Sequence, residues 1–189
     1  MPRRTSEELL SLFKENWPEG YSASEEVMLR LYHTALRHTE ELQKFLSQFE
    51  LSTVEFVTLR VLRREPEPHV MTPTMLYETL VMSPGGMTKL LKQLEAKQWI
   101  VRRSDHRDKR RSLVQLTPAG KGKILQAQRA VREFDTLMLA RTLDEVQQAQ
   151  LANLLRKLLI SLEPSKSAAA EVAWGDRYTA DRAITASSV

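Results

Sequence analysis

The sequence contains no cysteine. This absence excludes disulfide bonds, thiolate catalysis and redox sensing by cysteine. No apolar run approaches the ~20 residues that a membrane-spanning helix requires, so no membrane partner is expected. The N-terminal stretch Met1-Pro2-Arg3-Arg4 is basic but has no apolar segment behind it, which does not fit a secretory signal. With 42% hydrophobic and 28% charged residues, the chain is expected to be a globular cytoplasmic protein.

Sequence motifs of several enzyme groups are also missing. The chain has no HExxH metalloprotease motif, no phosphate-binding P-loop and no GxSxG nucleophile motif. The four histidines are scattered, and His33 and His38 are five residues apart, so they do not share a helix face as i,i+4 metal ligands would. We therefore predict no metal, no cofactor and no enzymatic activity. The alternative left open is an active site assembled from residues that are distant in sequence.

Residues 1–50 predict two helices, which we interpret as dimerisation helices. Apolar residues at helical spacing predict a helix over residues 5–16, and Trp17-Pro18-Glu19-Gly20 then breaks it. Ser24 is a candidate N-cap for a long helix that continues to about Phe49. One face of this long helix is mainly apolar and consists of Val27, Leu31, Ala35, His38, Leu42, Phe45 and Phe49.

Residues 51–120 predict a winged helix-turn-helix domain, in a chain that is mainly α with a small β-wing. Its first helix begins at a capping box, because the side chains of Ser52 and Glu55 are spaced to satisfy each other's backbone N–H groups. The helix continues to about Arg64. The segment Glu65-Pro66-Glu67-Pro68 then predicts a loop, since proline ends regular structure.

Two short helices follow this loop. Thr72-Pro73 combines a capping threonine with a proline in the first turn, which predicts a helix to about Val81. Ser83-Pro84 repeats this combination and opens a helix to about Lys97. Two short helices with so brief a connection are typical of a helix-turn-helix, in which the second helix enters the major groove of DNA.

This recognition helix has an apolar face and a polar face. Its apolar residues have helical spacing and are expected in the core: Met87, Leu90, Leu91 and Leu94. The remaining positions are candidates for DNA contact: Ser83, Gly85, Gly86, Thr88, Lys89 and Lys92. Each of the two glycines costs about 1 kcal/mol in helix propensity. Their presence has two explanations, either close approach of the backbone to a phosphate or base edge, or helix packing within the domain.

A basic β-hairpin is predicted next. Strands over residues 99–103 and 112–116 flank the loop 104–111. The segment from Ile100 to Lys123 contains eight Lys/Arg and two Asp, a net charge of +6, whereas the whole chain has +4. Such a concentration of positive charge is expected where a protein binds phosphates. The candidate contacts are Arg102, Arg103, Arg107, Lys109, Arg110 and Arg111. The alternative is a charged hairpin that is only solvated.

Residues 121–162 are predicted to form helices that mediate dimerisation. Thr117 and Pro118 open a helix to about Ala140, and Thr142 with Glu145 has the spacing of a second capping box. The helix behind it has a broad apolar stripe of Val146, Leu151, Leu154, Leu155, Leu158, Leu159 and Leu162. A second copy of the chain would cover this stripe, so we predict a homodimer. Burial within one subunit is the alternative. The tail, residues 163–189, is expected to be flexible or to pack on the dimer as an arm.

From Ser24 to Leu162, the chain resembles the MarR family of bacterial transcription regulators. The most specific match is the wing, in which Asp105-x-x-Asp108-x-Arg110 is followed by Leu116-Thr117-x-x-Gly120. The resemblance implies a dimeric winged-helix protein formed through its N- and C-terminal helices. It also implies that Asp105 and Asp108 brace the wing and that Arg110 enters the minor groove. A narrow minor groove has an enhanced negative potential that attracts arginine.

Within that family, Leu76-Tyr77 and the segment 83–89 look most like the PecS-type branch, which has an extra N-terminal helix. Urate-responsive members use a Trp, an Asp and two Arg. Trp17 matches the tryptophan, whereas the other positions hold Val57, Leu90 and Gln93. An anionic purine would lose its charged partners there, so we expect a small aromatic or apolar ligand instead. Candidate pocket residues are Trp17, Tyr32 and His38, for which the alternative is a packing role.

The combined prediction is a ligand-responsive repressor that binds double-stranded DNA as a homodimer. Two subunits would place their recognition helices about one DNA turn apart, which predicts a pseudo-palindromic operator of roughly 16–20 base pairs. Two alternatives from other functional classes are kept. One is a non-specific or architectural DNA-binding protein, which the same basic wing would serve. The other is a winged-helix module for protein–protein contact, which has less need of so many arginines.

Overall fold

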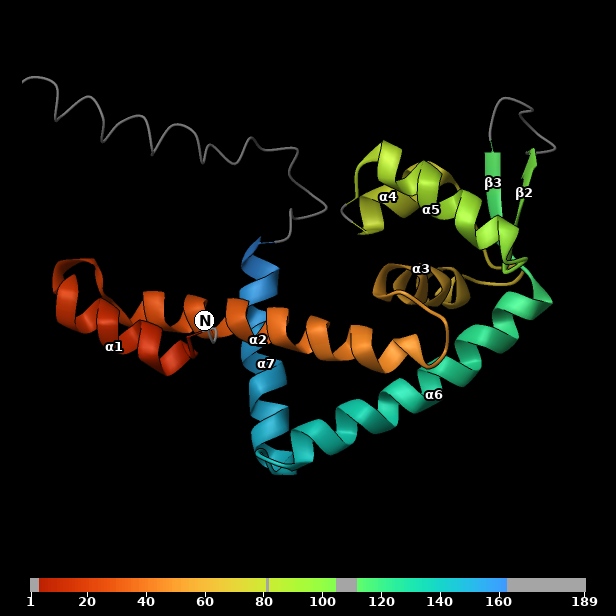
Figure 1. Cartoon of the computed structure of the whole chain (residues 1–189). Coiled ribbons are helices and arrows are strands. Elements are labelled where there is room, and N and C mark those ends of the chain that lie inside the picture. Colours follow the sequence, from red (N-terminus) through yellow and green to blue (C-terminus); the bar gives the residue numbers. More distant parts are fainter. Residues whose placement is uncertain (1–3, 81, 105–111, 163–189) are drawn as a thin grey trace, which may run out of the picture. The chain divides into compact units, whose positions relative to one another are not determined.

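The computed structural model describes residues 4–80, 82–104 and 112–162 (Figure 1). It is mostly helical with one small antiparallel sheet, as predicted. The described residues divide into two compact units, one that ends at Asp135 and one that begins at Thr136. None of the described helices combines the length and the apolar character needed to cross a membrane.

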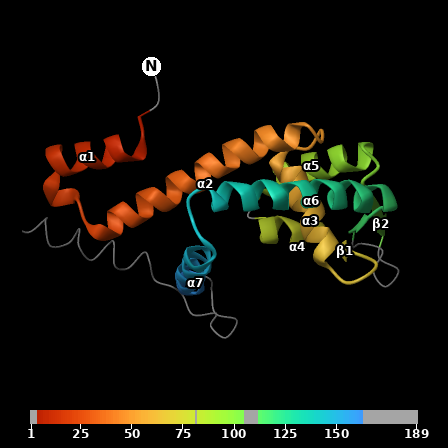
Figure 2. The same ribbon diagram turned by 90° about the horizontal axis from the view of Figure 1, so that it is seen from below.

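The N-terminal part contains α1 (Ser6–Asn16), the 3-10 turn η1 (Pro18–Gly20) and α2 (Ala23–Ser47). Helix α1 lies beside the N-terminal half of α2 in both views (Figures 1 and 2). The predicted N-cap of α2 was wrong by two residues. Ser22 caps the helix, since its hydroxyl accepts from the backbone N–H of Glu25 at 3.1 Å, and the Ser24 hydroxyl lies 2.8 Å from that of Ser22.

The predicted caps of the next three helices are confirmed. In α3 (Thr53–Arg64), Ser52 and Glu55 form both hydrogen bonds of the capping box. Helix α4 (Pro73–Leu80) begins where the Thr72 hydroxyl accepts from the N–H of Met75 at 3.2 Å. Helix α5 (Pro84–Ala96) has Ser83 as its N-cap. Helices α4 and α5 together form the predicted helix-turn-helix.

The sheet has three strands in the order β1-β3-β2, namely β1 (Val70–Met71), β2 (Ile100–Ser104) and β3 (Ser112–Leu116). Strands β2 and β3 form the predicted hairpin, with register from Ile100 opposite Leu116 to Ser104 opposite Ser112. Strand β1 was not predicted. It has two residues, too few to show an alternating pattern, and exists because it pairs with β3.

Two further helices follow, α6 (Pro118–Ala140) and α7 (Glu145–Leu162). The predicted start of α6 is confirmed, because the Thr117 hydroxyl accepts from the N–H of Gly120 at 3.0 Å. The capping box predicted for α7 at Thr142 and Glu145 was wrong by two residues, since Asp144 and Gln147 form it. Asp144 accepts from the N–H of Gln147 at 2.8 Å, and the Gln147 side chain accepts from the N–H of Asp144 at 2.9 Å.

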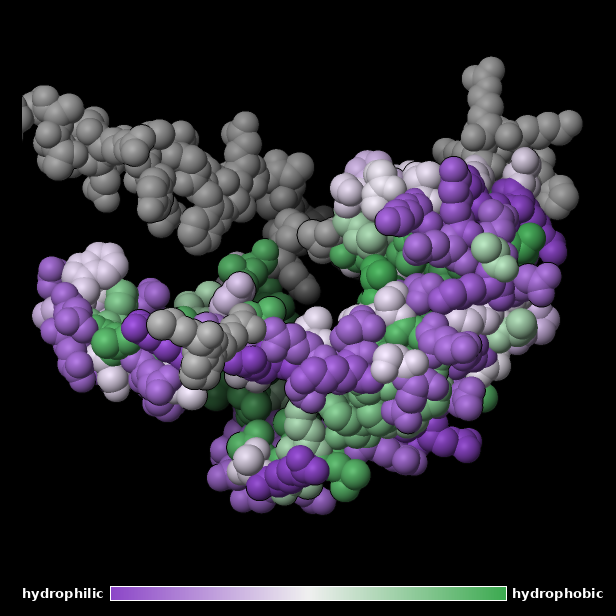
Figure 3. All heavy atoms as spheres, viewed as in Figure 1, coloured by the Kyte–Doolittle hydropathy of each residue, from purple (hydrophilic) through white to green (hydrophobic). Residues whose placement is uncertain are grey.

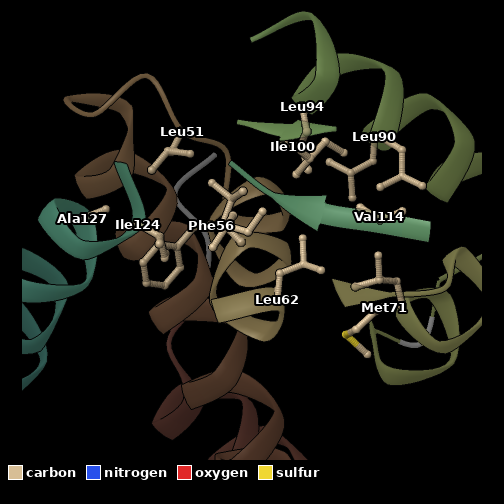
Figure 4. Close-up of a cluster of buried hydrophobic side chains, with 14 of the residues drawn as sticks. Leu51, Phe56, Leu62, Met71, Leu90, Leu94, Ile100, Val114, Ile124 and Ala127 are labelled. Atoms are coloured by element: carbon tan, nitrogen blue, oxygen red, sulfur yellow. The ribbon is translucent and has the colours of Figure 1, made fainter. Parts of the chain in front are cut away.

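One continuous hydrophobic core holds the first unit together (Figure 4). It receives Phe56 and Leu62 from α3, Leu90 from α5 and Val114 from β3, and all four are at most 3% exposed. The far end of α2 and the first half of α6 contribute to the same cluster through Leu42, Leu46, Ile124, Ala127 and Val131. The orientation of α5 is therefore set by packing on α4 and on the sheet.

Helix α7 contrasts with this core. It has no buried residue in the described chain, and Val146, Leu154 and Leu162 are each at least 60% exposed. Figure 3 shows hydrophobic surface on the visible parts of this helix. Exposed apolar stripes of this extent are typical of surfaces that bind a partner.

Candidate nucleic-acid interface

Helix α5 separates its apolar and polar residues as predicted. Met87, Leu90, Leu91 and Leu94 are at most 3% exposed and belong to the core. The polar face carries the exposed residues Ser83, Thr88, Lys89 and Lys92. Its two lysines therefore extend into solvent from a helix whose opposite face is fixed. This is the geometry that a recognition helix needs, because the core holds it and leaves its polar face open to a groove.

The Thr88 side chain has a defined orientation on this face. Its hydroxyl donates to the Pro84 carbonyl at 3.0 Å. The hydroxyl hydrogen is thereby used in a bond within the helix. The hydroxyl oxygen can still accept a hydrogen bond, and the methyl group can still make an apolar contact. A threonine methyl is suited to apolar contact with the methyl group of thymine.

The two glycines of α5 have different surroundings. A Cβ added to Gly85 would meet no atom of residues 4–80, 82–104 or 112–162 within 4 Å, whereas one added to Gly86 would lie 3.2 Å from the capping Oγ of Ser83. Packing within the chain therefore does not explain Gly85. At Gly86, the small side chain leaves room for the cap hydroxyl. Close approach of DNA to the backbone at Gly85 stays a prediction.

An ion pair between a buried carboxylate and an exposed lysine holds the C-terminal end of α5. The Lys97 Nζ lies 2.7 Å from Oε1 of Glu55, which is only 5% exposed, and 4.7 Å from the centroid of the Trp99 ring. Glu55 also accepts from the backbone N–H of Ser52 at 2.9 Å. Burial raises the pKa of Glu55, but the hydrogen bonds from Lys97 and Ser52 outweigh this effect and hold the pKa below its ordinary value. The sequence predicted the capping role of Glu55 but not its partner, which is 42 residues away.

The base of the wing presents further positive charge. Arg102 and Arg103 of β2 are exposed. Together with Glu95, Ser104 and Ser112 they line an open recess of about 320 Å³. Two guanidinium groups and two hydroxyls beside the C-terminal end of α5 provide donors that suit a phosphate. The other predicted wing residues lie outside the described residues: Asp105, Arg107, Asp108, Lys109, Arg110 and Arg111.

The three candidate pocket residues do not contact one another in the described chain. Trp17 is 54% exposed and forms a T-shaped contact with Phe13 at 5.2 Å between ring centroids. Tyr32 is 64% exposed. His38 makes a cross-helix contact, in which its Nε2 lies 3.1 Å from Oδ1 of Asp135 on α6.

Sequence reasoning missed a charged group that interacts with Asp135, the partner of His38. The Nε of Arg60 on α3 is buried and has no hydrogen-bond partner among the described residues. Its guanidinium lies 5.4 Å from the centroid of the Phe56 ring. Burial lowers the pKa of Arg60 and the charge of Arg64 acts in the same direction, while Asp135 opposes both. No sequence signal identifies this group, because His38, Arg60 and Asp135 come from three separate helices.

A helix-turn-helix followed by a β-hairpin, with cations on the exposed face of its second helix, defines a winged-helix DNA-binding protein. The model of the MarR family matches residues 49–111. The multiple antibiotic resistance protein MarR of Salmonella typhimurium is 30% identical over 118 residues, which cover 62% of this chain and 80% of that protein. The regulator PecS of Dickeya dadantii is 33% identical over 79 residues, which cover 42% of this chain and 48% of PecS.

The chain therefore belongs to the MarR family of transcription regulators, as its wing sequence predicted. The fold agrees. The structure of an Escherichia coli MarR variant complexed with operator DNA matches with a TM-score of 0.62 and 29% identity, covering 78% of this chain and 98% of that one. The predicted fold class, mainly α with a β-wing and a winged helix-turn-helix, is confirmed.

Proposed function

We propose that this regulator is a sequence-specific, ligand-responsive repressor that binds a pseudo-palindromic operator as a homodimer. The observation that carries the proposal is the exposed cationic face of α5, where Lys89 and Lys92 stand opposite a fully buried apolar face. Each subunit would place α5 in a major groove. The β2–β3 hairpin would reach the flanking minor groove, where the MarR resemblance assigns the contact to Arg110 and the bracing of the wing to Asp105 and Asp108.

The residues of the interface divide into two roles. Thr88 and Lys89, near the start of α5, are proposed to contact base edges, because the N-terminal residues of a recognition helix enter the groove first. Contacts to phosphates are proposed for Ser83, Gly85, Gly86, Lys92, Arg102, Arg103, Arg107, Lys109 and Arg111. Phosphate contacts set the position of the protein and the salt dependence of binding, whereas base contacts select the sequence.

The homodimer is supported by apolar surface that one chain leaves uncovered. Val146, Leu154 and Leu162 of α7 are exposed, as are Val27 and Tyr32 of α2. Both helices lie in the segments predicted to dimerise. A two-fold dimer would bury these residues against their copies and would match the symmetry of a pseudo-palindromic operator.

A ligand response is proposed through the region of Trp17, Tyr32 and His38. Trp17 and Tyr32 are more than half exposed in one chain, so a second subunit would be needed to complete a pocket around them. A small aromatic or apolar molecule is the proposed ligand. If it binds better to an arrangement of the two DNA-binding domains that does not fit the operator, it releases DNA by shifting the population of states.

Selection from a pool of random duplexes at near-physiological salt tests the proposal. A specific regulator should enrich a pseudo-palindrome and prefer it to random DNA by about a thousandfold or more. Steeply salt-dependent binding to every duplex, without enrichment, would favour an architectural protein. Complete absence of DNA binding would favour a protein-interaction module.

A further inference from the structure

His69 is the buried histidine of the described residues and lies at the base of the wing. Its side chain is only 2% exposed. The residue directly precedes β1, and its carbonyl accepts from the backbone N–H of Leu116, at the end of β3, at 3.2 Å. Its own N–H donates to the Pro66 carbonyl at 2.7 Å. The imidazole is therefore attached, through its backbone, to the strand that leads back from the wing.

The hydrogen-bond partners of the ring decide which nitrogen carries the hydrogen. Nδ1 lies 2.6 Å from the carbonyl oxygen of Glu65, which can only accept, so Nδ1 donates. Nε2 lies 3.1 Å from Nη1 of Arg63, and a guanidinium can only donate. Nε2 therefore accepts in this contact, which requires a neutral imidazole with its hydrogen on Nδ1.

A carboxylate lies within reach of the same nitrogen. Oε1 of Glu67 is 2.9 Å from Nε2 of His69, and it can accept a hydrogen bond there only when Nε2 also carries a hydrogen, which makes the ring cationic. Lys121 of α6 donates to both oxygens of Glu67, at 2.8 and 3.0 Å. The hydrogen bond from Lys121 is the main reason why the pKa of Glu67 lies below its ordinary value, although desolvation opposes it. The acceptor is therefore charged at neutral pH.

Nε2 thus faces a donor and an acceptor, and the two contacts exclude each other. In the neutral ring, the bond from Arg63 ties the residue before β1 to the last turn of α3. In the protonated ring, the guanidinium is a like charge without an acceptor, and Arg63 is exposed, so it can move into water. Strands β1 and β3 contain no ionisable side chain. The charged groups that face the ring in the described structure are Arg63 of α3, Glu67 of the loop and, behind it, Lys121 of α6.

We propose that His69 is a positioning residue for the wing and that its partner depends on pH. Uptake of a proton transfers Nε2 from Arg63 to Glu67 and releases β1 from α3. Because β1 pairs with β3, this release loosens the support of the wing hairpin. Histidine ordinarily changes its charge between about pH 5 and pH 8. The effect on DNA rests on the proposed function, and operator affinity is expected to be lower at the acidic end of this range.

Three variants test the exchange of partners. His69→Asn cannot take up a proton in this range, and asparagine suits the left-handed backbone at this position, where φ is 58°. Glu67→Gln removes the charged acceptor at an exposed position, so the test does not depend on the folding of His69→Asn. Lys121→Gln is the matched control, because it breaks the ion pair with Glu67 but leaves the carboxylate for the ring.

Two measurements on the full chain are made at about pH 8 and about pH 5, the limits of the histidine range. Nitrogen-15 NMR of the His69 ring reports which nitrogen carries a hydrogen. Gel-shift titration at constant salt gives the affinity for the selected operator. Circular dichroism checks that each variant keeps its helix content.

At about pH 8, the hydrogen of the parent ring is expected on Nδ1 alone, and at about pH 5 on both nitrogens, with a change in the guanidinium signals of Arg63. On this change of pH, the parent should lose operator affinity by at least about threefold relative to His69→Asn, the effect of one hydrogen bond. Glu67→Gln should match His69→Asn in its pH dependence, and Lys121→Gln should match the parent.

Several outcomes would overturn the proposal. A hydrogen on Nε2 instead of Nδ1 at about pH 8 would mean that Arg63 is not the partner of the neutral ring, and a ring that is still neutral at about pH 5 would remove the exchange. The same pH dependence of affinity in the parent, His69→Asn and Glu67→Gln would separate His69 from DNA binding. If the parent binds no DNA at either pH, the proposed function fails, and the ring signals still decide whether the partners exchange.

Discussion

The backbone at Gly120 lies directly against the carbonyl group of Trp99. A Cβ built on Gly120 would be 2.1 Å from the Trp99 oxygen and 2.9 Å from its carbonyl carbon. The same oxygen accepts from the N–H of Thr117 at 3.0 Å, while the Thr117 hydroxyl donates to the Gln98 carbonyl at 2.7 Å. These contacts join the first turn of α6 to the residues that precede β2. The close approach of the Trp99 carbonyl explains why position 120 of the wing motif is a glycine.

Gly120→Ala is expected to destabilise the protein by at least about 2 kcal/mol, because the methyl group would overlap a backbone carbonyl that cannot move away alone. Gly122→Ala is the matched control on the same helix, since its Cβ would meet nothing within 4 Å in the part of the chain that the structure describes. That variant should be as stable as the parent or more stable by up to about 1 kcal/mol, from helix propensity. Urea unfolding at one protein concentration measures both. Equal stability of the two variants would contradict this account of the wing junction.

Glu55→Gln is expected to lower the free energy of unfolding at pH 7 by about 1–2 kcal/mol, since Lys97 loses its charged partner. The ordinary value for this carboxyl is 4.5, and its pKa in the folded protein is lower. The carboxylate therefore stabilises the fold at pH values above 4.5, and this contribution is lost as the pH falls through the lower folded-state pKa.

Unfolding curves between pH 3 and pH 7 test this dependence. The difference in stability between the parent and Glu55→Gln should shrink as the pH falls below 4.5. Glu41→Gln is a control, because its pair with Lys44 is exposed and should contribute within about 0.5 kcal/mol at any pH. A difference for Glu55→Gln that does not change with pH would mean that the carboxylate has no electrostatic role.

Gly85→Ala separates folding from DNA binding. None of the described residues lies within 4 Å of the added Cβ, so the thermal midpoint should not fall. Operator affinity should fall by about tenfold or more if the α5 backbone approaches DNA closely at this position, a change of about 1.4 kcal/mol. Gel-shift titration with the selected operator gives the affinity. Unchanged affinity would leave the glycine without a role in DNA contact.

Lys89→Gln and Lys92→Gln are expected to have different effects on the salt dependence of binding. Removal of a lysine that binds a phosphate reduces the slope of log K against log salt concentration by about 0.9. We expect this smaller slope for Lys92→Gln. For Lys89→Gln we expect a reduced preference for operator over random DNA. Lys44→Gln, on α2, should change neither quantity. Stability should stay within about 0.5 kcal/mol, because all three side chains are exposed.

A chain that ends at Leu143 lacks α7 and is expected to be monomeric or insoluble. The reason is that α7 carries apolar residues such as Leu154 and Leu162, which are at least 60% exposed in one subunit and need a partner. Light scattering coupled to size-exclusion chromatography measures the mass in solution. A stable dimer from the shortened chain would show that α7 is not required for dimerisation.

Local chemistry explains which helices could be predicted. Ser52 with Glu55, and Ser83 with Pro84, act within one helical turn, so their short-range hydrogen bonds can be read from spacing. The errors have the same origin. Ser22 and Ser24 are both acceptable caps for α2, and Thr142 competes with Asp144 as a cap for α7. The choice between neighbouring caps depends on the path of the preceding chain, which spacing does not encode.

The sequence by itself determined the order of the helices and of the two wing strands, the buried face of α5 and the positive charge of the wing. Helix periodicity, caps and charge are properties of nearby residues, so they can be read without the fold. Only the tertiary structure decided which distant groups meet. Lys97 reaches Glu55, and the Gly120 backbone meets Trp99. Such contacts follow from the packing of whole helices around a common core, and no short-range pattern specifies which side chains that packing brings together.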